Sequence, residues 1–481
     1  MSTQYSKSVL KCTVVFHSKS LYALYMIDPR HRSYFEGKKI TVMGLGLLGR
    51  GVGDAKFLAE CGAEVTVTDL KSAEQLRVSV EQLSAFANIT FILGEHRLED
   101  FENKDMILVA AGVPFDSPYL EHAKKQNVPL TMSAALFAQL SKVPMVGVTG
   151  TRGKSTVAAM IHHVLTSLTG EEIVLGGNIR GVSNLQLLKE VKEDSVVVFE
   201  LDSWQLQGFG WAKISPQIAV FTNFMPDHLN YYKNDLNSYF KDKAQIFLYQ
   251  DDHDVLVTTP EVLEKAKLFA TKVDITLGQE VVLTDMSVLP EDFTLRIPGE
   301  HNRLNAALAF GALQALSLRE EEILDSLSTF SGVSGRLEYM GEVDGVKIYN
   351  DNNSTTPQAT IAGLEALGSD SPKVVLIAGG AYKDVDPSPL VFVLEKYCKK
   401  IILLPGSGTE HLLAALTSSS TDKVTVASLE EAVQKAREVS VQGDVLLFSP
   451  AFASFGMFAN EYERNDAFVA IIEDILEHEN V

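Results

Sequence analysis

Short apolar runs alternate with stretches of helical periodicity along most of the chain. The first run covers residues 40–43 and ends in glycines, a helical pattern follows at 53–61, and further runs cover 64–68 and 105–110. Continuous apolar strands that alternate with helices are typical of a parallel sheet covered on both faces. The pattern therefore predicts an α/β fold that opens with a βαβ unit.

The same alternation returns in two later blocks. In the second block we expect strands at residues 144–148, 195–199 and 217–221, and helices at 157–168 and 304–316. Residues 251–284 are polar and predict an irregular segment with a few short strands. In the third block we expect parallel strands at 346–349, 373–378, 401–404 and 445–448, and helices at 359–367 and 429–437.

A chain of 481 residues has room for roughly three domains at about 150 residues each. We expect three consecutive α/β domains: a Rossmann-like N-terminal domain at 37–133, a nucleotide-binding central domain at 134–332, and a Rossmann-like C-terminal domain at 333–481. Residues 1–36 are rich in Lys and Arg, and their apolar stretch at 14–16 is stopped at once by polar residues. We interpret them as an N-terminal extension rather than a secretory signal. Met26 is an alternative start, and we expect residues 1 to about 33 to be dispensable.

Acidic residues outnumber basic ones by 62 to 42, which gives a net charge of −20. This balance argues against nucleic acid or an anionic membrane surface as a partner, although a local phosphate site needs only backbone N–H groups and one lysine. The three cysteines (Cys12, Cys61 and Cys398) lie far apart and predict reduced structural thiols. The chain has no uninterrupted apolar run of about 18 residues, so we predict no membrane-spanning helix. We expect a cytoplasmic protein.

The first glycine motif joins Gly44, Gly46 and Gly49 directly after a predicted strand, and Asp69 follows twenty residues after Gly49. Glycines at this spacing permit a tight turn and bring the backbone close to a phosphate at a helix N-terminus. The pattern is that of a dinucleotide-binding turn with an acid for the ribose. It is equally compatible with NAD, with another nucleotide, or with no nucleotide.

The second motif, at residues 146–156, is a strand, a glycine loop and a helix that contains Gly153-Lys154-Ser155. The strict phosphate-loop pattern has glycine six residues before the lysine, where this chain has Val148. Loop N–H groups would surround the phosphates of ATP, Lys154 would neutralise their charge, and the Ser155 hydroxyl would reach Mg²⁺. The central domain is therefore predicted to be a P-loop ATP-binding domain.

Residues 149–156 (TGTRGKST) resemble the TGTNGKST loop of the Mur ligases, with Arg152 where Asn is usual. Other segments resemble motifs of this family in the same order, from about residue 37 to the C-terminus: ELDSWQL at 200–206, Asn223 with DHL at 227–229, GEHNRLN at 299–305, GRLE at 335–338, YNDN at 349–352 and SPAFASF at 449–455. The last segment resembles the branch that adds D-glutamate.

The resemblance implies an ATP-dependent amide ligase that activates a carboxylate as an acyl phosphate. Its substrates would be UDP-N-acetylmuramoyl-L-alanine and D-glutamate, in peptidoglycan precursor synthesis, and we expect a monomer. ATP would be bound by Gly150, Thr151, Gly153, Lys154, Ser155, Thr156, Asn305, Arg336 and Asp351. Catalysis would rest on Lys154, Glu200, His228, Lys243 and Arg336. Two Mg²⁺ ions would be held by Ser155, Glu200, His228 and Lys243, the last as a carbamate.

In the same resemblance the first domain holds the UDP part of the substrate instead of NAD. Leu47, Leu48 and Gly49 would lie at the diphosphate, Asp69 near the uracil, and Asn178 at the muropeptide. The acceptor would be bound in the third domain by Thr355, Lys383, Ser454 and Phe455, with Lys383 facing its side-chain carboxylate.

Three residues depart from the family pattern: Asn353, Phe452 and Glu461 stand where many members have Lys, Cys and an aromatic residue. Because of these departures, the resemblance specifies the ATP chemistry more closely than the identity of the acceptor amino acid. The alternatives are another Mur-type or folylpolyglutamate-type ligase with a different acceptor, an NAD-dependent oxidoreductase, and a non-catalytic nucleotide-gated binding protein.

Overall fold

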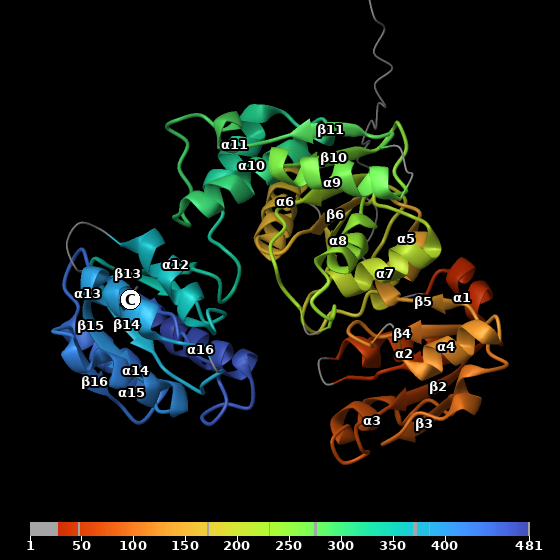
Figure 1. Ribbon diagram of the computed structural model, residues 1–481, viewed down its shortest axis with the longest axis horizontal. Helices are drawn as coiled ribbons and strands as arrows, with labels where there is room; N and C mark the ends of the chain where they lie inside the picture. Colours follow the sequence, from red (N-terminus) through yellow and green to blue (C-terminus); the bar gives the residue numbers. More distant parts are fainter. Residues whose placement is uncertain are drawn as a thin grey trace, which may run out of the picture.

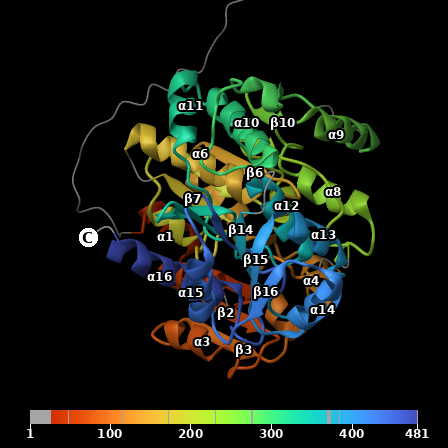
Figure 2. The same ribbon diagram turned by 90° about the vertical axis from the view of Figure 1, so that its left-hand side faces the viewer.

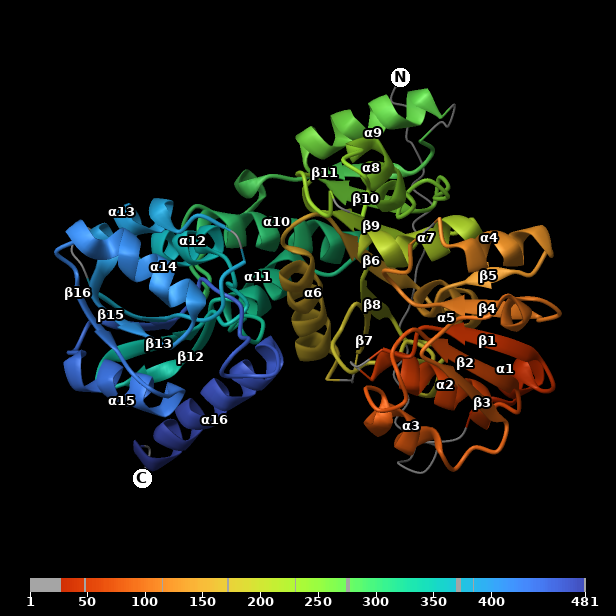
Figure 3. The ribbon, with the colours of Figure 1, turned by 60° about the horizontal axis from the view of Figure 1, so that its bottom comes forward.

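The computed structural model describes residues 27–46, 49–114, 116–170, 173–229, 231–273, 277–368, 373–383 and 385–479. Three α/β domains follow one another along the chain, and Figure 1 shows the middle domain between the other two. This confirms the predicted fold class and the three-domain order. Seen from below, the N-terminal and C-terminal domains lie on opposite sides of the middle domain (Figure 3).

The N-terminal domain has a parallel sheet in the order β3-β2-β1-β4-β5. Its strands are β1 (Lys39–Met43), β2 (Glu64–Asp69), β3 (Ile89–Leu93), β4 (Met106–Val109) and β5 (Leu130–Thr131). Its helices are α1 (Pro29–Phe35), α2 (Arg50–Glu60), α3 (Arg77–Leu83), the short 3₁₀ helix η1 (Leu98–Phe101) and α4 (Pro118–Lys125). The strand order reverses between β1 and β4, so the first glycine motif lies at a topological switch point, where α/β sheets bind ligands.

Helix α1 lies within the predicted extension but packs on the N-terminal domain. Phe35 is completely buried, and its ring meets Phe57 of α2 edge-on at 6.0 Å between centroids. The Asp28 side chain accepts a hydrogen bond from the Arg30 N–H and caps the helix. The described part of the N-terminal domain therefore includes residues before position 37, while residues 1–26 of the extension lie outside the described residues.

The middle domain has a parallel sheet in the order β11-β10-β9-β6-β8-β7. Its strands are β6 (Met145–Thr149), β7 (Val174–Gly177), β8 (Val197–Glu200), β9 (Ile218–Phe221), β10 (Val255–Thr258) and β11 (Glu280–Leu283). Its helices are α5 (Ser133–Ser141), α6 (Lys154–Thr169), η2 (Gln186–Lys189), α7 (Ser203–Ala212), α8 (Leu236–Ala244), α9 (Pro260–Lys272), η3 (Met286–Val288), α10 (Glu300–Ala315) and α11 (Glu320–Ser328).

The short strands expected at 251–284 are confirmed as β10 and β11, but the segment between them is not irregular, because it contains helix α9. Helix α9 buries Val262, Leu263, Ala266 and Ala270 and turns its charged residues outward. Its polar face lowers the average hydrophobicity of the segment and conceals the apolar stripe.

The C-terminal domain has a sheet in the order β12-β13-β17-β14-β15-β16. Its strands are β12 (Glu338–Val343), β13 (Val346–Asn350), β14 (Val374–Ala378), β15 (Cys398–Leu403), β16 (Asp422–Thr425) and β17 (Val445–Phe448). Its helices are α12 (Pro357–Leu367), α13 (Ser388–Tyr397), α14 (Ser407–Ala415), η4 (Leu416–Ser418), α15 (Leu429–Val439) and α16 (Glu461–Glu479). The four strands expected there are parallel, but β12 pairs antiparallel with β13 through a tight turn at Asp344-Gly345.

The three domains do not share one core. A continuous apolar cluster joins the N-terminal and middle domains and contains Phe35, Phe57, Phe137 and Phe199. The rings of Phe137 from α5 and Phe199 from β8 stack at 4.6 Å. The clusters inside the C-terminal domain contain only residues from position 337 onward. Figure 2 views the molecule from the side of this separate domain, with β14 and β15 in front.

Candidate active site

The phosphate loop connects β6 to α6 and depends on two glycines. Gly150 (φ +145°) and Gly153 (φ +82°) have backbone angles that other residues rarely adopt. A β-carbon at Gly150 would clash with the Thr222 hydroxyl, and one at Gly153 would clash with the Asn305 amide. Because neither position has room for a side chain, the loop backbone is the surface that a ligand would meet.

The segment after β9 fixes the shape of this loop. The backbone N–H of Arg152 donates to Asn223 Oδ1 and that of Thr151 donates to the Asn223 carbonyl, both at 2.9 Å. The Gly153 N-cap has no side-chain capping bond, so the first turn of α6, with Ser155 and Thr156, presents open N–H groups. Such a helix end binds phosphate.

Lys154 lies at the start of α6 and Glu200 at the end of β8, and their opposite charges interact. Lys154 Nζ donates to the Thr151 carbonyl at 3.2 Å. Burial lowers the pKa of Lys154, while the charges of Glu200 and Asp202 act to raise it. Asp202 caps α7 by accepting from the Gln205 N–H at 2.7 Å. Glu200 is only 4% exposed and ends its strand beside the loop, so it is the carboxylate available to a metal.

Lys243 of α8 is almost completely buried, with 1% of its surface exposed. Its Nζ donates to the Gly150 carbonyl at 2.7 Å, which places the amine directly beneath the phosphate loop. Burial and, second, the positive charge of Lys154 lower the pKa of Lys243 to about 7. A substantial fraction of this amine is therefore neutral near pH 7.

His228 follows β9 and has a left-handed backbone (φ +51°). Its ring packs on Trp204 at 4.7 Å and near Tyr239 at 6.0 Å between centroids. Burial lowers the pKa of His228, so its imidazole is neutral at neutral pH. The positive charges of Lys243 and Lys154 also act to lower this pKa.

Sequence reasoning missed how His228 is supported. Trp204 packs on Tyr231, and the Tyr231 hydroxyl donates to the carbonyl of Val113 in the N-terminal domain at 3.0 Å. Gln207 also donates to the Tyr231 hydroxyl, at 3.2 Å. The sequence carries no signal for this contact, because Tyr231 is indistinguishable from a packing residue and its partner is a backbone atom of another domain.

A cavity of about 530 Å³ lies between the middle and C-terminal domains. It brings together sequence-predicted residues from both sides: Ser155, Asn178, Glu200, Arg336, Thr355, Lys383, Ser454 and Phe455. Lys383 Nζ donates to the Thr355 hydroxyl at 3.0 Å. The residues expected for the acceptor and two of those expected for magnesium therefore line one space, which we call the acceptor cavity.

The three departures from the family pattern differ in their placement. Asn353 and Glu461 line the acceptor cavity. Phe452 is 2% exposed and fills the core of the C-terminal domain, against Gly408. Phe452 is therefore a packing residue, while the other two can influence the acceptor.

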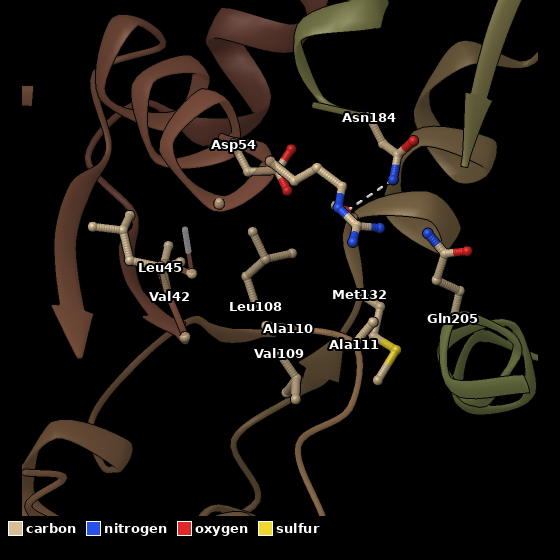
Figure 4. A pocket seen from close by; sticks show the side chains of 15 residues that line it. Val42, Leu45, Asp54, Leu108, Val109, Ala110, Ala111, Met132, Asn184 and Gln205 are labelled. Carbon is tan, nitrogen blue, oxygen red and sulfur yellow. Dashed lines mark hydrogen bonds between the residues drawn. The ribbon is translucent and has the colours of Figure 1, made fainter. Parts of the chain in front are cut away.

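A second cavity, of about 240 Å³, lies between the first glycine motif and the middle domain. Figure 4 shows Leu45 and Asp54 on its N-terminal side and Asn184 and Gln205 on the other. Gly49 begins α2 without a side-chain cap, and Arg50 of the same turn donates to Asn178 Oδ1 at 2.7 Å. Leu47 and Leu48 lie outside the described residues.

Two predicted ligand-binding acids are occupied by protein groups in the structure. Asp69 Oδ2 accepts from the N–H groups of Leu45 and Gly46 at 2.9 and 3.1 Å, so it braces the glycine turn. Asp351 accepts from the Leu337 N–H at 3.1 Å and from the Ser449 hydroxyl at 2.8 Å. Burial raises the pKa of Asp351 to about 6. Contacts of these acids with uracil and ribose stay predictions.

The other predicted nucleotide residues lie at the loop or the cavity. The Asn305 amide sits against Gly153 and donates to Asn302 Oδ1 at 3.3 Å. Arg336 is exposed at the wall of the acceptor cavity. Among the described residues, no group of three or more His, Cys, Asp or Glu side chains could hold a metal ion. The predicted metal set therefore depends on the Ser155 hydroxyl and on modification of Lys243.

The chain matches three family models: "Mur ligase MurD-like, N-terminal domain" at 38–132, "Mur ligase middle domain" at 148–313 and "Mur ligase, glutamate ligase domain" at 335–452. It is 35% identical to UDP-N-acetylmuramoylalanine--D-glutamate ligase of Roseiflexus sp. (strain RS-1), covering 91% of this chain and 98% of the relative. The chain belongs to the Mur ligase family. This Mur ligase is also 33% identical to the enzyme of the same name from Borreliella burgdorferi (strain ZS7), over 90% of this chain and 97% of that one.

A solved structure with the same fold is UDP-N-acetylmuramate-alanine ligase MurC from Thermotoga maritima. It has a TM-score of 0.57 and 20% identity, and covers 91% of this Mur ligase and 100% of its own chain. The family assignment confirms the expected resemblance and removes the oxidoreductase alternative, since the first domain matches a Mur ligase domain instead of a dehydrogenase. Within the described residues, no helix is long and apolar enough to cross a membrane.

Proposed function

We propose that this Mur ligase joins D-glutamate to UDP-N-acetylmuramoyl-L-alanine with ATP, as a step of peptidoglycan precursor synthesis. The observation that carries the proposal is the acceptor cavity, with Ser155 and Glu200 on one wall and the Lys383–Thr355 pair on the other. The names of the relatives support the choice of substrates.

A free carboxylate is a poor acyl donor, because its negative charge repels a nucleophile. Transfer of the γ-phosphoryl group from ATP to this carboxylate gives an acyl phosphate, whose phosphate is a good leaving group. The acceptor amine then attacks the carbonyl carbon, and inorganic phosphate departs. Lys154 and the open N–H groups of α6 neutralise the charge that accumulates on the transferred group. Arg336 approaches the same group from the C-terminal domain.

The donors around the phosphate loop fit magnesium, which prefers oxygen ligands and keeps substrate phosphates among them. The Ser155 hydroxyl and the Glu200 carboxylate would hold a first ion, and His228 with a carbamylated Lys243 would hold a second. When bound, the ions neutralise phosphate charge during transfer. Gly150 and Gly153 leave the loop backbone bare for the phosphates that complete this set.

Carbamylation of Lys243 follows from the state of its amine. The ammonium first loses one proton to solvent. The lone pair of the neutral amine then attacks the carbon of CO₂, an N–C bond forms as one C=O π bond opens, and a second N–H proton leaves to solvent, so that the original cation becomes a carbamate anion. The reaction requires a neutral amine, and burial supplies one. A mass gain of one CO₂ on Lys243 in protein digested without acid tests this step, and an unmodified amine in fully active enzyme would contradict it.

The N-terminal domain is proposed to hold the UDP moiety, with the diphosphate at the uncapped first turn of α2. Asn178, which contacts both Arg50 and Glu200, then lies between this substrate and the metal site. We also propose that the enzyme acts as a monomer. ATP and a UDP-linked substrate are cytoplasmic metabolites, and we propose that the reaction takes place there.

Glu461 favours a second candidate, in which the acceptor has a neutral or cationic side chain. Its carboxylate lines the acceptor cavity and would repel the second carboxylate of D-glutamate. In that case the ATP chemistry is unchanged and another amino acid is added.

Phosphate release distinguishes the candidates when the enzyme is given UDP-N-acetylmuramoyl-L-alanine, ATP and single amino acids. We expect release with D-glutamate and none without the UDP substrate. Preference for lysine, L-alanine or diaminopimelate would refute the D-glutamate assignment. Glu461→Gln should then be tested first for a change of preference.

A further inference from the structure

Residues 177–184, which follow β7, contact all three domains. Asn178 accepts from Arg50 of the N-terminal domain at 2.7 Å, and its backbone N–H donates to the Glu200 carbonyl at 2.7 Å. The Ser183 hydroxyl donates to Asp54 of α2 at 2.6 Å. Arg180, in the same segment, extends to α16 of the C-terminal domain.

This segment is held firmly on both sides of Arg180. Gly177 has φ +88°, and a β-carbon there would clash with the Glu200 carbonyl. The Gly177 N–H also donates to Asn184 Oδ1 at 2.8 Å. Asp54 and Ser183 are both buried, at 6% exposure each. The backbone on both sides of Arg180 is therefore held in place.

The guanidinium of Arg180 meets two residues of α16. Its Cζ lies 4.0 Å from the ring centroid of Tyr462, and Nη1 lies 3.4 and 3.5 Å from the two carboxylate oxygens of Asp466. Tyr462 and Asp466 are four positions apart and so lie on one face of the helix. The guanidinium thus stacks on the Tyr462 ring and pairs with the Asp466 carboxylate.

These three residues line the acceptor cavity, together with Glu461. The walls of this cavity also carry Glu200 of the middle domain and Lys383 of the C-terminal domain. The distance between those walls depends on where α16 stands relative to residues 177–184. Acylation requires the acceptor amine to reach the acyl phosphate within about 3 Å, so a small displacement of the walls would slow it.

We propose that Arg180 is a positioning residue, which holds α16 against the middle domain and so sets the width of the acceptor cavity. It acts through Tyr462 and Asp466 and does not itself bind the acceptor. The inference rests on the proposed function only in taking this cavity as the acceptor site.

The expected effect is modest, because the contact is partly exposed. The side chains of Arg180 and Asp466 are 46% and 62% exposed, where an ion pair contributes little. A cation–π contact at such a site adds a modest further attraction, so the two together correspond to about a tenfold effect.

Arg180→Met is the first variant, since it keeps the apolar stem and removes the charge. We expect the KM for the acceptor to rise about tenfold, while the KM for ATP changes less than about twofold. Arg180→Lys should restore part of the loss, because it keeps a cation over the Tyr462 ring. The matched control is Arg77→Met, which removes an exposed arginine that pairs with Glu81 within α3.

A double-mutant cycle separates positioning from direct binding. If Arg180 acts through α16, Arg180→Met and Tyr462→Leu should be non-additive, and the double variant should be no worse than the poorer single one. Fully additive losses would overturn the proposal in favour of direct contact with the acceptor. Unchanged acceptor KM in Arg180→Met would overturn it as well.

X-ray scattering gives a readout that does not depend on the acceptor. We expect a larger radius of gyration for Arg180→Met than for wild type, in the presence of ADP, and no change for Arg77→Met. Equal radii would contradict the positioning role. If wild type failed to use D-glutamate, the proposed function would fail, yet the scattering comparison would still decide the role of Arg180.

Discussion

The two domain interfaces of this Mur ligase are built differently. Between the N-terminal and middle domains, the apolar core is continuous, the bond of Ser183 to Asp54 is buried, and the ion pair of Lys189 with Glu60 is partly buried. Between the middle and C-terminal domains lies a cavity, and the contact of Arg180 with Asp466 is exposed. Buried hydrophobic contact resists separation, whereas a small polar interface permits domain motion.

Because of this difference, the groups for carboxylate activation and those for amide formation are not held equally firmly before the substrates bind. The parts that would activate the carboxylate (Lys154, Glu200, His228 and Lys243) belong to the middle domain, and His228 is supported from the N-terminal domain through Tyr231. The parts expected for the acceptor belong to the separate domain. Most of the activating groups are therefore fixed before closure, while Arg336 and the residues expected for the acceptor come into place only when the C-terminal domain closes.

The largest expected effect comes from Lys154→Ala. Loss of the cation that faces the transferred phosphoryl group should lower kcat by at least about a hundredfold, which corresponds to several kcal/mol. Phosphate release is the measurement, and thermal unfolding should be unchanged. Lys265→Ala, at an exposed pair with Glu261, is the control. Residual activity above about a tenth of wild type would contradict the role.

Phe35→Ala tests whether the first two domains unfold together. Removing this completely buried ring should cost about 3–5 kcal/mol and lower the unfolding transition shared by the N-terminal and middle domains. Leu376→Ala, in the core of the C-terminal domain, should lower only a separate transition. Phe392→Ala is the neutral control, because that ring is 73% exposed. Calorimetry is the measurement. If both core variants shifted one common transition equally, the C-terminal domain would not unfold separately from the other two.

Asp351 makes the stability of the C-terminal domain depend on pH. Its pKa is raised from an ordinary value near 3.8 to about 6, so the folded state binds the proton more tightly than the unfolded state. The contribution is complete below the unfolded pKa and is lost as the pH rises through the folded value.

Between pH 5 and 7, the group should therefore lower the free energy of unfolding by about 1 kcal/mol. Urea unfolding at several pH values measures this slope. Asp351→Asn, which cannot titrate, should remove that part of it. A slope that is identical in wild type and variant would show that Asp351 is ionised in both states.

Tyr231→Phe should have the smallest effect. It removes the hydrogen bond to the Val113 carbonyl but keeps the ring that packs on Trp204. A neutral hydrogen bond contributes about 1 kcal/mol, so kcat should fall about fivefold with an unchanged KM for ATP. Tyr249→Phe, at a partly exposed ring away from His228, is the control. Equal kinetics in both variants would mean that the first domain does not support His228.

The residues found from sequence are those whose chemistry is local. Lys154 and Ser155 follow a glycine loop between a strand and a helix, and this order alone predicts their surroundings. Asp69 and Asp351 come shortly after the apolar runs at 64–68 and 346–349, which predict strands, but their hydrogen bonds to backbone and hydroxyl groups depend on how the next loop folds back. Arg180 could not be found, because its partner Asp466 lies 286 residues away.

The separate core of the C-terminal domain has a consequence for how such ligases can diversify. A domain with its own apolar clusters can accumulate substitutions, or be exchanged as a unit, without disturbing the packing of the other two. Glu461 and Asn353 lie in this domain, at the wall of the acceptor cavity that Ser155 of the middle domain also lines. The amino acid substrate can thus change while the residues that bind and transfer phosphate stay the same. Ligases with different acceptors can therefore share one set of activating residues.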